Sequence, residues 1–456
     1  MATLPSQVFW NLANVDKNTL TFQLRPTHVG YANTLRRMVL TGVESVAFRA
    51  DMNDKGATTD VVVTTNTTPM TNEMLADRIG LVPVHVDDPL AWNPEEYIFT
   101  LSVTNETADT KPVLASDFEV RKKGHPEDDP VLVPNTQFFR PDPISKDTCL
   151  IAVLKGKQMN QNPQKIEITA KATTGTGREH IRFSPVSQCS YAYTLDTDEG
   201  RQREMFEKWL VNNKKVDPSS LASDEKRRSA LEREFQTMEI QRCFLVNEKG
   251  EPFSFDFVIE TIGIQPVSRI VERALQNIET RCVQYANLST GNLPETVRIQ
   301  PAEARMKGFD FIFQKEDHTL GNLLQSWMED NLMDTKEITF AGYKVPHPLR
   351  DEMLLRVGVE DGQETTARAM VGKAAAACAE MFRQWRHDWL RATGAPIGSR
   401  SRDTLRLTAA NAKALVSAAS DAGLPAAPTS MAPRTVTSAA PRRSALKKPV
   451  SVAAKQ

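Results

Sequence analysis

The chain has few cysteines and places them far apart, which limits the metal and redox chemistry it can carry. It has five among 456 residues, and no two of them form a C-x-x-C pair. This spacing argues against a zinc ribbon, an iron–sulfur site and a disulfide framework. We therefore expect five reduced thiols, several of them small core residues. They are Cys149, Cys189, Cys243, Cys282 and Cys378.

Long apolar runs and the usual catalytic motifs are also missing. No stretch is long and apolar enough to span a bilayer, and residues 1–10 lack the basic start and apolar run of a secretory signal. We expect an intracellular protein without a membrane partner. Residues 174–177 (Thr-Gly-Thr-Gly) lack the Lys-Ser/Thr ending of a phosphate-binding loop, and no nucleophile elbow or pair of metal ligands occurs elsewhere. A freestanding enzyme therefore has no candidate site here.

The composition is that of a globular protein with a basic C-terminal extension. A hydrophobic share of 40%, a charged share of 25% and the chain length indicate about three domains plus extensions. The net charge is −1, but residues 394–456 hold ten basic residues against two acidic ones. We expect this Ala-, Ser-, Thr- and Pro-rich segment to be mostly disordered, with one short helix near residues 409–419. Its basic clusters at 441–443 and 447–449 could bind nucleic acid or serve as a nuclear address, and a solubilising extension is the simpler interpretation.

The hydrophobic pattern predicts the same kind of module twice. Residues 7–50, continued at 252–287, and residues 296–392 each predict strand, strand, helix, strand, strand, helix. Alternating apolar residues predict strands of a sheet with one buried face. Apolar residues at three- and four-residue steps mark the first helix of each copy. They are Tyr31, Leu35, Met38, Val39, Val43 and Val46 in one copy and Leu320, Leu323, Leu324, Trp327 and Met328 in the other.

The second helix of each copy carries more apolar residues than one sheet face can bury. Pro266 occupies the preferred first position of one helix, and the other is predicted from about Thr365 to Gly394. Half a dozen large side chains left in water would cost on the order of 10 kcal/mol. Each helix face therefore needs a partner, and the sister module is the nearest one. We predict that the two modules pair within the chain.

A mainly β domain is predicted to interrupt the first module, because the pattern changes to short strand-like runs broken by Pro, Gly and Asn. The runs are residues 60–65, 97–104, 149–154 and 166–172. A charged helical stretch follows at 200–212 and 223–242. The link 287–294 then holds the second module at an effective concentration of order millimolar. The predicted fold class is α+β with antiparallel sheets and these parts: first dimerisation module, 1–50 and 197–290; insert domain, 51–196; second module, 291–395; basic low-complexity tail, 396–456.

Two sets of motifs resemble the α-like subunits of multisubunit RNA polymerases. Residues 33–37 (Asn-Thr-Leu-Arg-Arg), 73–83 (Glu-Met-Leu-Ala-Asp-Arg-Ile-Gly-Leu-Val-Pro) and 177–180 (Gly-Arg-Glu-His) with Pro185 resemble the third-largest subunit of eukaryotic RNA polymerase II and its archaeal and bacterial counterparts. Residues 315–322 (Lys-Glu-Asp-His-Thr-Leu-Gly-Asn) and 340–349 (Phe-Ala-Gly-Tyr-Lys-Val-Pro-His-Pro-Leu) resemble the small eleventh subunit. The resemblance covers residues 5–392. A fusion of the two resembles the arrangement in large nucleocytoplasmic DNA viruses.

The resemblance implies a non-catalytic assembly platform of a DNA-directed RNA polymerase. The two modules would form an α-like heterodimer within one chain, and the largest, second-largest and small polymerase subunits would assemble on it for transcription. It implies no cofactor, contact with DNA or RNA only through the complex or the tail, and a location in the nucleus or a cytoplasmic viral factory, with packaging in the virion. The alternative is a polymerase-independent nucleic-acid-binding protein that acts through its tail. Deletion of residues 396–456 distinguishes the two.

Three groups of site residues follow from the resemblance. The docking surface for the large subunits consists of Arg36, Arg37, Glu73 and Arg78. The insert-domain loop that contacts neighbouring subunits consists of Gly177, Arg178, Glu179 and His180. The dimer interface consists of Leu35, Val39, Ile270, Leu275, His318, Leu320, Leu323, Tyr343, Pro346, His347, Phe382 and Trp385. Arginine suits docking because its planar fork binds carboxylates through two hydrogen bonds.

Simpler interpretations stand beside several of these motifs. Adjacent arginines on a helix are usually a solvated face. Residues 317–319 (Asp-His-Thr) suggest an acid beside a base, but at a helix N-terminus Asp317 or Thr319 would cap free backbone amides. The two prolines of residues 343–349 predict a rigid turn between strands at 338–342 and 353–359. The family's nuclear members often bind zinc through cysteines after the Leu-Val-Pro segment. Residues 84–130 contain no cysteine, so we expect no metal.

Overall fold

The computed structural model describes residues 7–51, 60–123, 130–159, 161–289, 293–303 and 306–394. The predicted tail at 396–456 and its short helix lie outside these ranges. Within the described ranges, no helix combines the length and the apolar character needed to cross a membrane.

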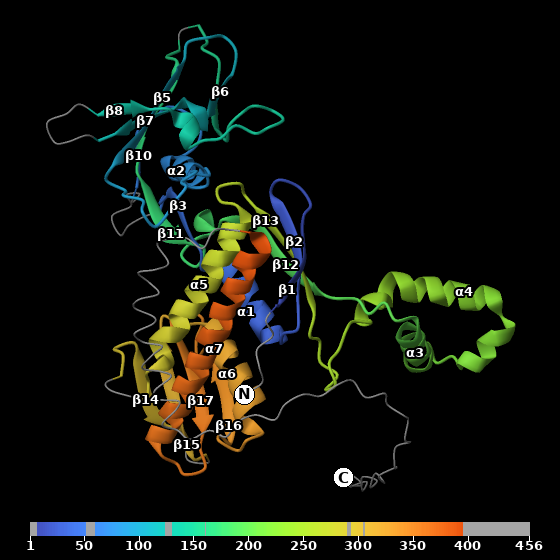
Figure 1. The fold of residues 1–456 in the computed structure, drawn as a ribbon. Helices are drawn as coiled ribbons and strands as arrows, with labels where there is room; N and C mark the ends of the chain where they lie inside the picture. The colour runs from blue at the N-terminus through green and yellow to red at the C-terminus, as the bar shows by residue number, and fades with distance from the viewer. Residues whose placement is uncertain are drawn as a thin grey trace, which may run out of the picture. The chain divides into compact units, whose positions relative to one another are not determined.

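Two four-stranded antiparallel sheets of identical topology form the two modules (Figure 1). The first sheet has the order β1-β2-β13-β12, and the second has the order β14-β15-β17-β16. The elements of the first module are β1 (Phe9–Asn14), β2 (Thr19–Leu24), α1 (Val29–Thr41), β12 (Val186–Tyr193), β13 (Phe255–Thr261) and α5 (Val267–Ala286). Those of the second are β14 (Val297–Pro301), β15 (Gly308–Gln314), α6 (His318–Met328), β16 (Phe340–Lys344), β17 (Glu352–Gly358) and α7 (Glu364–Thr393). The predicted α+β class and the repeated module are confirmed.

The fourth strand of the first sheet differs from the prediction. The strand after α1, β3 (Glu44–Phe48), leaves the sheet and pairs with β11 (Ala172–Thr176). Its place is taken by β12, which pairs with β13 and is the counterpart of β16. The predicted insert boundary at residue 196 is therefore too late, because β12 belongs to the first module. Val46, predicted to continue the helical stripe of α1, lies on β3, since α1 ends where the N–H of Gly42 donates to the Met38 carbonyl.

The inserted domain is mainly β, as predicted, and has its own core. Its five-stranded sheet has the order β4-β10-β5-β7-β8, and a second pair consists of β6 and β9. A cluster of buried residues from Val46 to Ala172 holds it together. Its elements are β4 (Val61–Asn66), α2 (Asn72–Gly80), β5 (Tyr97–Asn105), β6 (Lys111–Leu114), β7 (Phe118–Lys122), β8 (Val131–Val133), β9 (Leu150–Leu154) and β10 (Gln164–Ala170).

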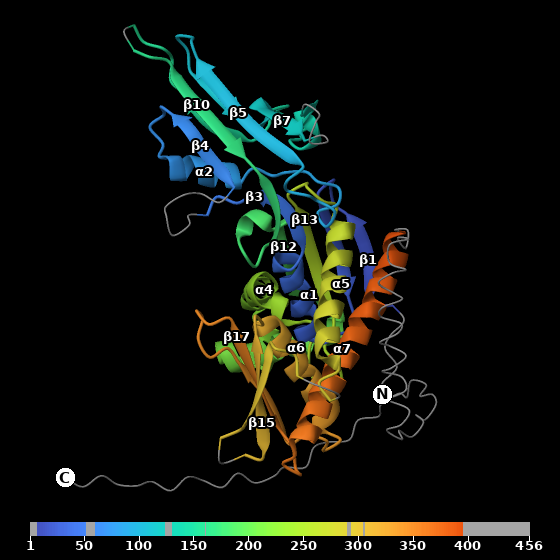
Figure 2. The same ribbon diagram turned by 90° about the vertical axis from the view of Figure 1, so that its left-hand side faces the viewer.

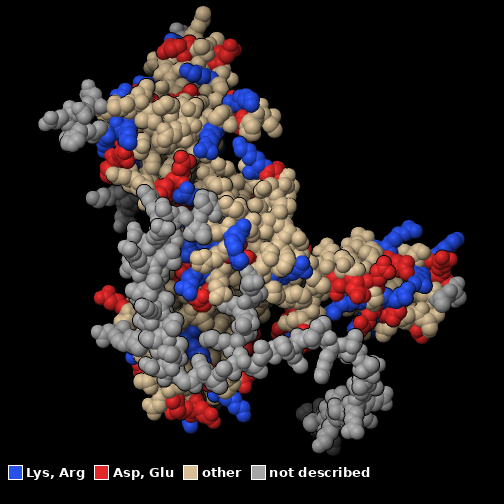
Figure 3. Space-filling model, in the orientation of Figure 1, with Lys and Arg blue, Asp and Glu red and all other residues tan. Residues whose placement is uncertain are grey.

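The charged stretch after β12 forms a helical arm. Its helices are α3 (Glu199–Trp209) and α4 (Glu225–Glu234), and each continues into one π-helical turn. They close over a small cluster that contains Trp209, Leu210 and Phe235. Basic and acidic side chains are interspersed on the face of the arm that Figure 3 shows. The prediction of solvated surface helices is right for the outer faces but did not include this local core.

Helices of the two modules pack together. α5 and α7 lie side by side in both ribbon views (Figures 1 and 2). α1 contacts α6, so each helix packs against its own counterpart. One hydrophobic cluster runs from Val8, just before β1, to Trp389 near the end of α7 and includes residues of both modules. The predicted pairing of the modules is thus the core of the fold.

Candidate functional site: the junction between the two modules

The central contact of the junction is the antiparallel pair of α5 and α7. The start of α5 meets the end of α7, where the indole N–H of Trp389 donates to the Ser268 carbonyl at 2.8 Å. At the other end, a Cβ on Gly372 would lie 2.9 Å from the Ala286 carbonyl oxygen. Only a residue without a side chain allows this close approach. The helices therefore touch along their length.

The last turns of α7 also complete the sheet of the first module. Trp389 is fully buried and packs edge-on against Phe9 and Phe22, with ring centroids 4.9 and 5.3 Å apart. The buried carboxylate of Asp388 accepts hydrogen bonds from the backbone N–H groups of Val8 and Phe9, at 2.7 and 3.1 Å. A helix of the second module thus satisfies backbone donors at the start of the first module's edge strand. Neither module is complete without the other.

A second contact joins α1 to α6. The Arg37 guanidinium donates to the Thr319 hydroxyl at 2.8 Å and lies 3.5 Å from the Asp317 carboxylate. Asp317 caps α6, as predicted, by accepting from the Thr319 N–H. Burial alone would raise the pKa of Asp317, but the hydrogen bonds from Thr319 and the charges of Arg178 and Arg37 hold it below its ordinary value. Arg37 therefore binds the sister module.

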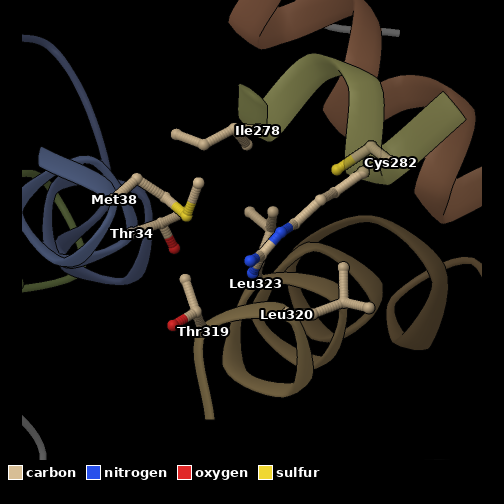
Figure 4. A pocket seen from close by; sticks show the side chains of 8 residues that line it. Thr34, Met38, Ile278, Cys282, Thr319, Leu320 and Leu323 are labelled. Atoms are coloured by element: carbon tan, nitrogen blue, oxygen red, sulfur yellow. The ribbon is translucent and has the colours of Figure 1, made fainter. Parts of the chain in front are cut away.

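Side chains from α1, α5 and α6 converge between these contacts (Figure 4). Thr34 and Met38 come from α1, Ile278 and Cys282 from α5, and Leu320 and Leu323 from α6. They leave a cavity of about 10 Å³, which is room for at most about one water molecule. The junction is packed like a protein interior and offers no space here for a ligand.

A buried carboxylate lies at the entrance to α6. Glu316 accepts a hydrogen bond from the Tyr285 hydroxyl at 3.0 Å, and Arg281 lies 3.8 Å away. Both partners come from α5. Burial raises the pKa of Glu316, and the Arg281 charge and the Tyr285 hydrogen bond only partly oppose this. The charged form is therefore disfavoured in the folded chain.

Replacement of Glu316 by glutamine should change how stability depends on pH. A carboxyl group with a raised folded-state pKa stabilises the protein when protonated, and this stability is lost as pH rises through the folded pKa. Glutamine stays neutral, so the melting temperature of Glu316→Gln should rise relative to wild type from pH 4.5, the group's ordinary pKa, upward through the raised value. Thermal melts across this range measure the difference. Glu248→Gln in an exposed turn is the control. If the melting temperatures of Glu316→Gln and wild type differed by the same amount at every pH, the raised pKa of Glu316 would be contradicted.

Most of the predicted interface residues lie in the shared core. Tyr343 is half-buried, packs against this core and meets the α6 face at Gly321. His318 is exposed and packs on Tyr343 of its own module, while Pro346 and His347 are exposed in the turn between β16 and β17. These three exposed residues are not part of the core that the modules share. The buried ones are Leu35, Val39, Ile270, Leu275, Leu320, Leu323, Phe382 and Trp385.

The four predicted docking residues have different surroundings. Arg36 is half-buried, donates to the Asn33 side chain at 3.0 Å and has no carboxylate within ion-pair distance among the described residues. Arg37 is engaged by α6, as described above. Glu73 is exposed at the start of α2, whereas Arg78 donates to the carbonyls of Ile151 and Leu150 on β9. Of the four, only Arg37 has a partner of opposite charge among the described residues.

The predicted contact loop is turned partly inward. The Arg178 guanidinium donates to the Lys315 carbonyl at 2.7 Å and to the Asp351 carboxylate at 2.5 Å, both in the second module. Glu179 pairs with Arg49 at 2.7 Å, and the His180 ring accepts from Arg182. At Gly177, a Cβ would collide with the Leu40 carbonyl oxygen at 2.3 Å. This loop braces the second module against the insert.

Several charged residues of the junction were not predicted. Asp388, Glu279, Arg386 and Glu316 are all at least nine-tenths buried. In sequence they look like ordinary surface charges on a helix or a turn. The one available signal was the position of Asp388 and Arg386 beside the apolar stripe of α7, next to Trp385 and Trp389.

The cysteines agree with the prediction of small core residues. All five are free thiols, and four of them are buried. Burial raises the pKa of Cys282 to about 12, so its thiol stays protonated. In the described ranges, no three His, Cys, Asp or Glu side chains lie close enough together to hold a metal ion.

Comparisons with known proteins agree with this architecture. A family model described as the RNA polymerase Rpb3/Rpb11 dimerisation domain matches residues 21–282, more than half of the chain, and a second model of the same description matches residues 309–388. The chain is 23% identical over 276 residues to DNA-directed RNA polymerase subunit Rpo3 of Methanopyrus kandleri, covering 59% of this chain and 91% of that protein. It is 24% identical over 301 residues to DNA-directed RNA polymerase II subunit RPB3 of Schizosaccharomyces pombe, covering 61% and 86%. A 47-residue stretch is 53% identical to the probable DNA-directed RNA polymerase II subunit RPB11 of Caenorhabditis briggsae, covering 10% and 35%.

Proposed function

We propose that this chain is a non-catalytic platform on which the two large polymerase subunits assemble. The premise is its family: the chain belongs to the RNA polymerase Rpb3/Rpb11 dimerisation-domain family and is a fused α-like subunit. The pairing of the modules within the chain is the observation that carries this proposal. It buries both long apolar helix faces in one core. The chain can then present its outer surface to larger partners without first finding a separate partner.

Arg36 is the centre of the proposed docking surface. It lies on α1 beside the junction, and its charge has no acidic partner among the residues that the structure describes. A half-buried arginine fork is weakly hydrated and can bind a carboxylate of another subunit in bidentate fashion. Glu73 and Arg78 on α2 form a second part of the surface, for which the second-largest subunit is the proposed partner. Fusion in one chain supports a source among large nucleocytoplasmic DNA viruses.

Charge reversal at Arg36 tests the docking surface. Arg36→Glu should leave the melting temperature of the purified chain within a few degrees of wild type and abolish copurification with the second-largest subunit. Arg37→Glu is a poorer test, because it would also break the contact with Asp317 and Thr319. The measurement is affinity purification from the native source, with partners identified by mass.

Arg227→Glu on the arm is the matched control, since Arg227 is exposed and has no ion pair within the described part of the chain. Full recovery of the large subunit with Arg36→Glu would remove Arg36 from the docking surface. A wild-type chain that brings down no polymerase subunits would contradict the platform itself.

A further inference from the structure

A buried ion pair lies in the middle of the α5–α7 contact. The Arg386 guanidinium on α7 lies 3.3 Å from the Glu279 carboxylate on α5, and each side chain is 9% exposed. The pair is poorly satisfied, because Glu279 Oε2 and Arg386 Nε have no hydrogen-bond partner in the described structure. Replacing such a pair by apolar residues is often neutral or stabilising. Stability therefore does not explain its presence.

The repeated topology gives each residue of the pair a counterpart. The buried positions of α5 and α7 coincide when Val271 is aligned with Val371 and Ala274 with Ala374. In this alignment Glu279 corresponds to Ala379, and Arg386 corresponds to Ala286. Both alanines are buried. The junction thus holds a charged pair at one place and two alanines at the place related by the internal repeat.

This asymmetry penalises pairing between like modules of two chains. Each helix of the junction packs against its counterpart, so an α5–α5 pair would set Glu279 against Ala286. An α7–α7 pair would set Arg386 against Ala379. Each arrangement would bury a charge without a counter-ion, and this is strongly destabilising.

Neighbouring charges would not compensate. On α5, Arg273 binds Glu44 and Arg281 lies beside Glu316. On α7, Arg383 pairs with Glu380. Besides Arg386, the charges that act on Glu279 are those of Arg383 and Glu380, and these two pair with each other.

We propose that Glu279 and Arg386 form a selectivity pair, which restricts the modules to unlike pairing and keeps a second copy of this chain from docking through its α5 or α7 face. A single buried polar contact can specify a partner in this way even where it adds no stability. The proposal concerns the isolated chain and does not depend on polymerase docking.

The test compares three full-length chains refolded from denaturant at matched concentration. They are the wild type, the neutral variant Glu279→Leu/Arg386→Leu and the charge-swapped variant Glu279→Arg/Arg386→Glu. Native mass spectrometry and light scattering measure the dimer fraction. The neutral variant should show about a tenfold or larger increase, because like pairing no longer buries a lone charge. The charge-swapped chain keeps a complementary pair and should match the wild type.

Two chains can also dimerise by exchanging unlike modules, so that residue 279 of one chain faces residue 386 of the other. This pairing is the same as within one chain, so such dimers add an equal background to all three samples. Equal dimer fractions in the neutral variant and the wild type would overturn the proposal, whether or not the charge-swapped chain refolds. Thermal melts add an independent measurement. Glu279→Leu and Arg386→Leu alone should each melt below the neutral double variant, and single variants as stable as the double would show that the two residues are not coupled.

Discussion

Replacement of Trp389 by alanine is expected to lower the free energy of unfolding by about 3 to 5 kcal/mol, as for other fully buried tryptophans. The side chain is wholly buried, packs against Phe9 and Phe22, and donates a hydrogen bond to Ser268. These contacts join α7 to the sheet and to the first turn of α5 in the other module. The loss is a large part of the roughly 5 to 15 kcal/mol that holds a typical protein folded. Urea unfolding followed by tryptophan fluorescence and circular dichroism measures it.

Trp10→Ala is the matched control for this change. Trp10 also donates its indole N–H to a backbone carbonyl, that of Arg25 at 3.0 Å, but it is only half-buried on β1. Its loss should cost much less. Trp389→Phe keeps an aromatic ring against Phe9 and should fall between the two. Equal effects of Trp389→Ala and Trp10→Ala would contradict a central role of the α7 end in the junction.

Replacement of Asp388 by alanine is expected to cost about 2 to 4 kcal/mol, because two buried N–H groups lose their acceptor. The groups belong to Val8 and Phe9, at the start of β1. The strand should then open more often, and amide hydrogen exchange of residues 8 and 9 should become faster. Chemical unfolding gives the free energy, and exchange followed by mass spectrometry locates the change.

Asp388→Asn separates loss of the acceptor from loss of the charge. Its amide oxygen can still accept from one or both N–H groups, so it should retain much of the stability that Asp388→Ala loses. If asparagine were as destabilising as alanine, the charge near Arg391 would be the important property instead. Unchanged exchange at residues 8 and 9 in Asp388→Ala would contradict the proposed link between α7 and β1.

The elements that local pattern determines could be predicted from the sequence. The last helix was expected from Thr365 to Gly394, and α7 spans Glu364–Thr393 with Gly394 in the left-handed conformation as its cap. Asp317 was expected to cap α6, and it does. Helix periodicity and capping depend on residues within a few positions, so the sequence alone contains the information. Which strands join one sheet depends on residues far apart in sequence. For this reason β3 was expected as the fourth strand of the first sheet, where the structure has β12.

The residues of the candidate site also differ in whether local sequence could predict their surroundings. Apolar residues such as Leu35 and Phe382 were predicted because a stripe on a helix must be covered. Arg37 was assigned to an outward surface because its neighbours in sequence cannot show that Asp317 and Thr319 lie opposite. The buried charges Glu279, Arg386 and Asp388 need partners on other elements. Glu279 and Arg386 pair with each other across 107 residues of sequence, and Asp388 binds Val8 across 380 residues. Such pairs become visible only when the chain is folded.

The bond from Asp388 to Val8 spans 380 residues of sequence, and this separation affects synthesis. At roughly 5 to 20 residues per second, a ribosome needs on the order of 20 to 80 s to add the residues between them. During that interval the first strand has been made but its acceptor has not. Until the end of α7 leaves the exit tunnel, the rings of Phe9 and Phe22 in the nascent first module lack the cover of Trp389. Chaperones that bind exposed apolar strands would have their main opportunity to act during this interval.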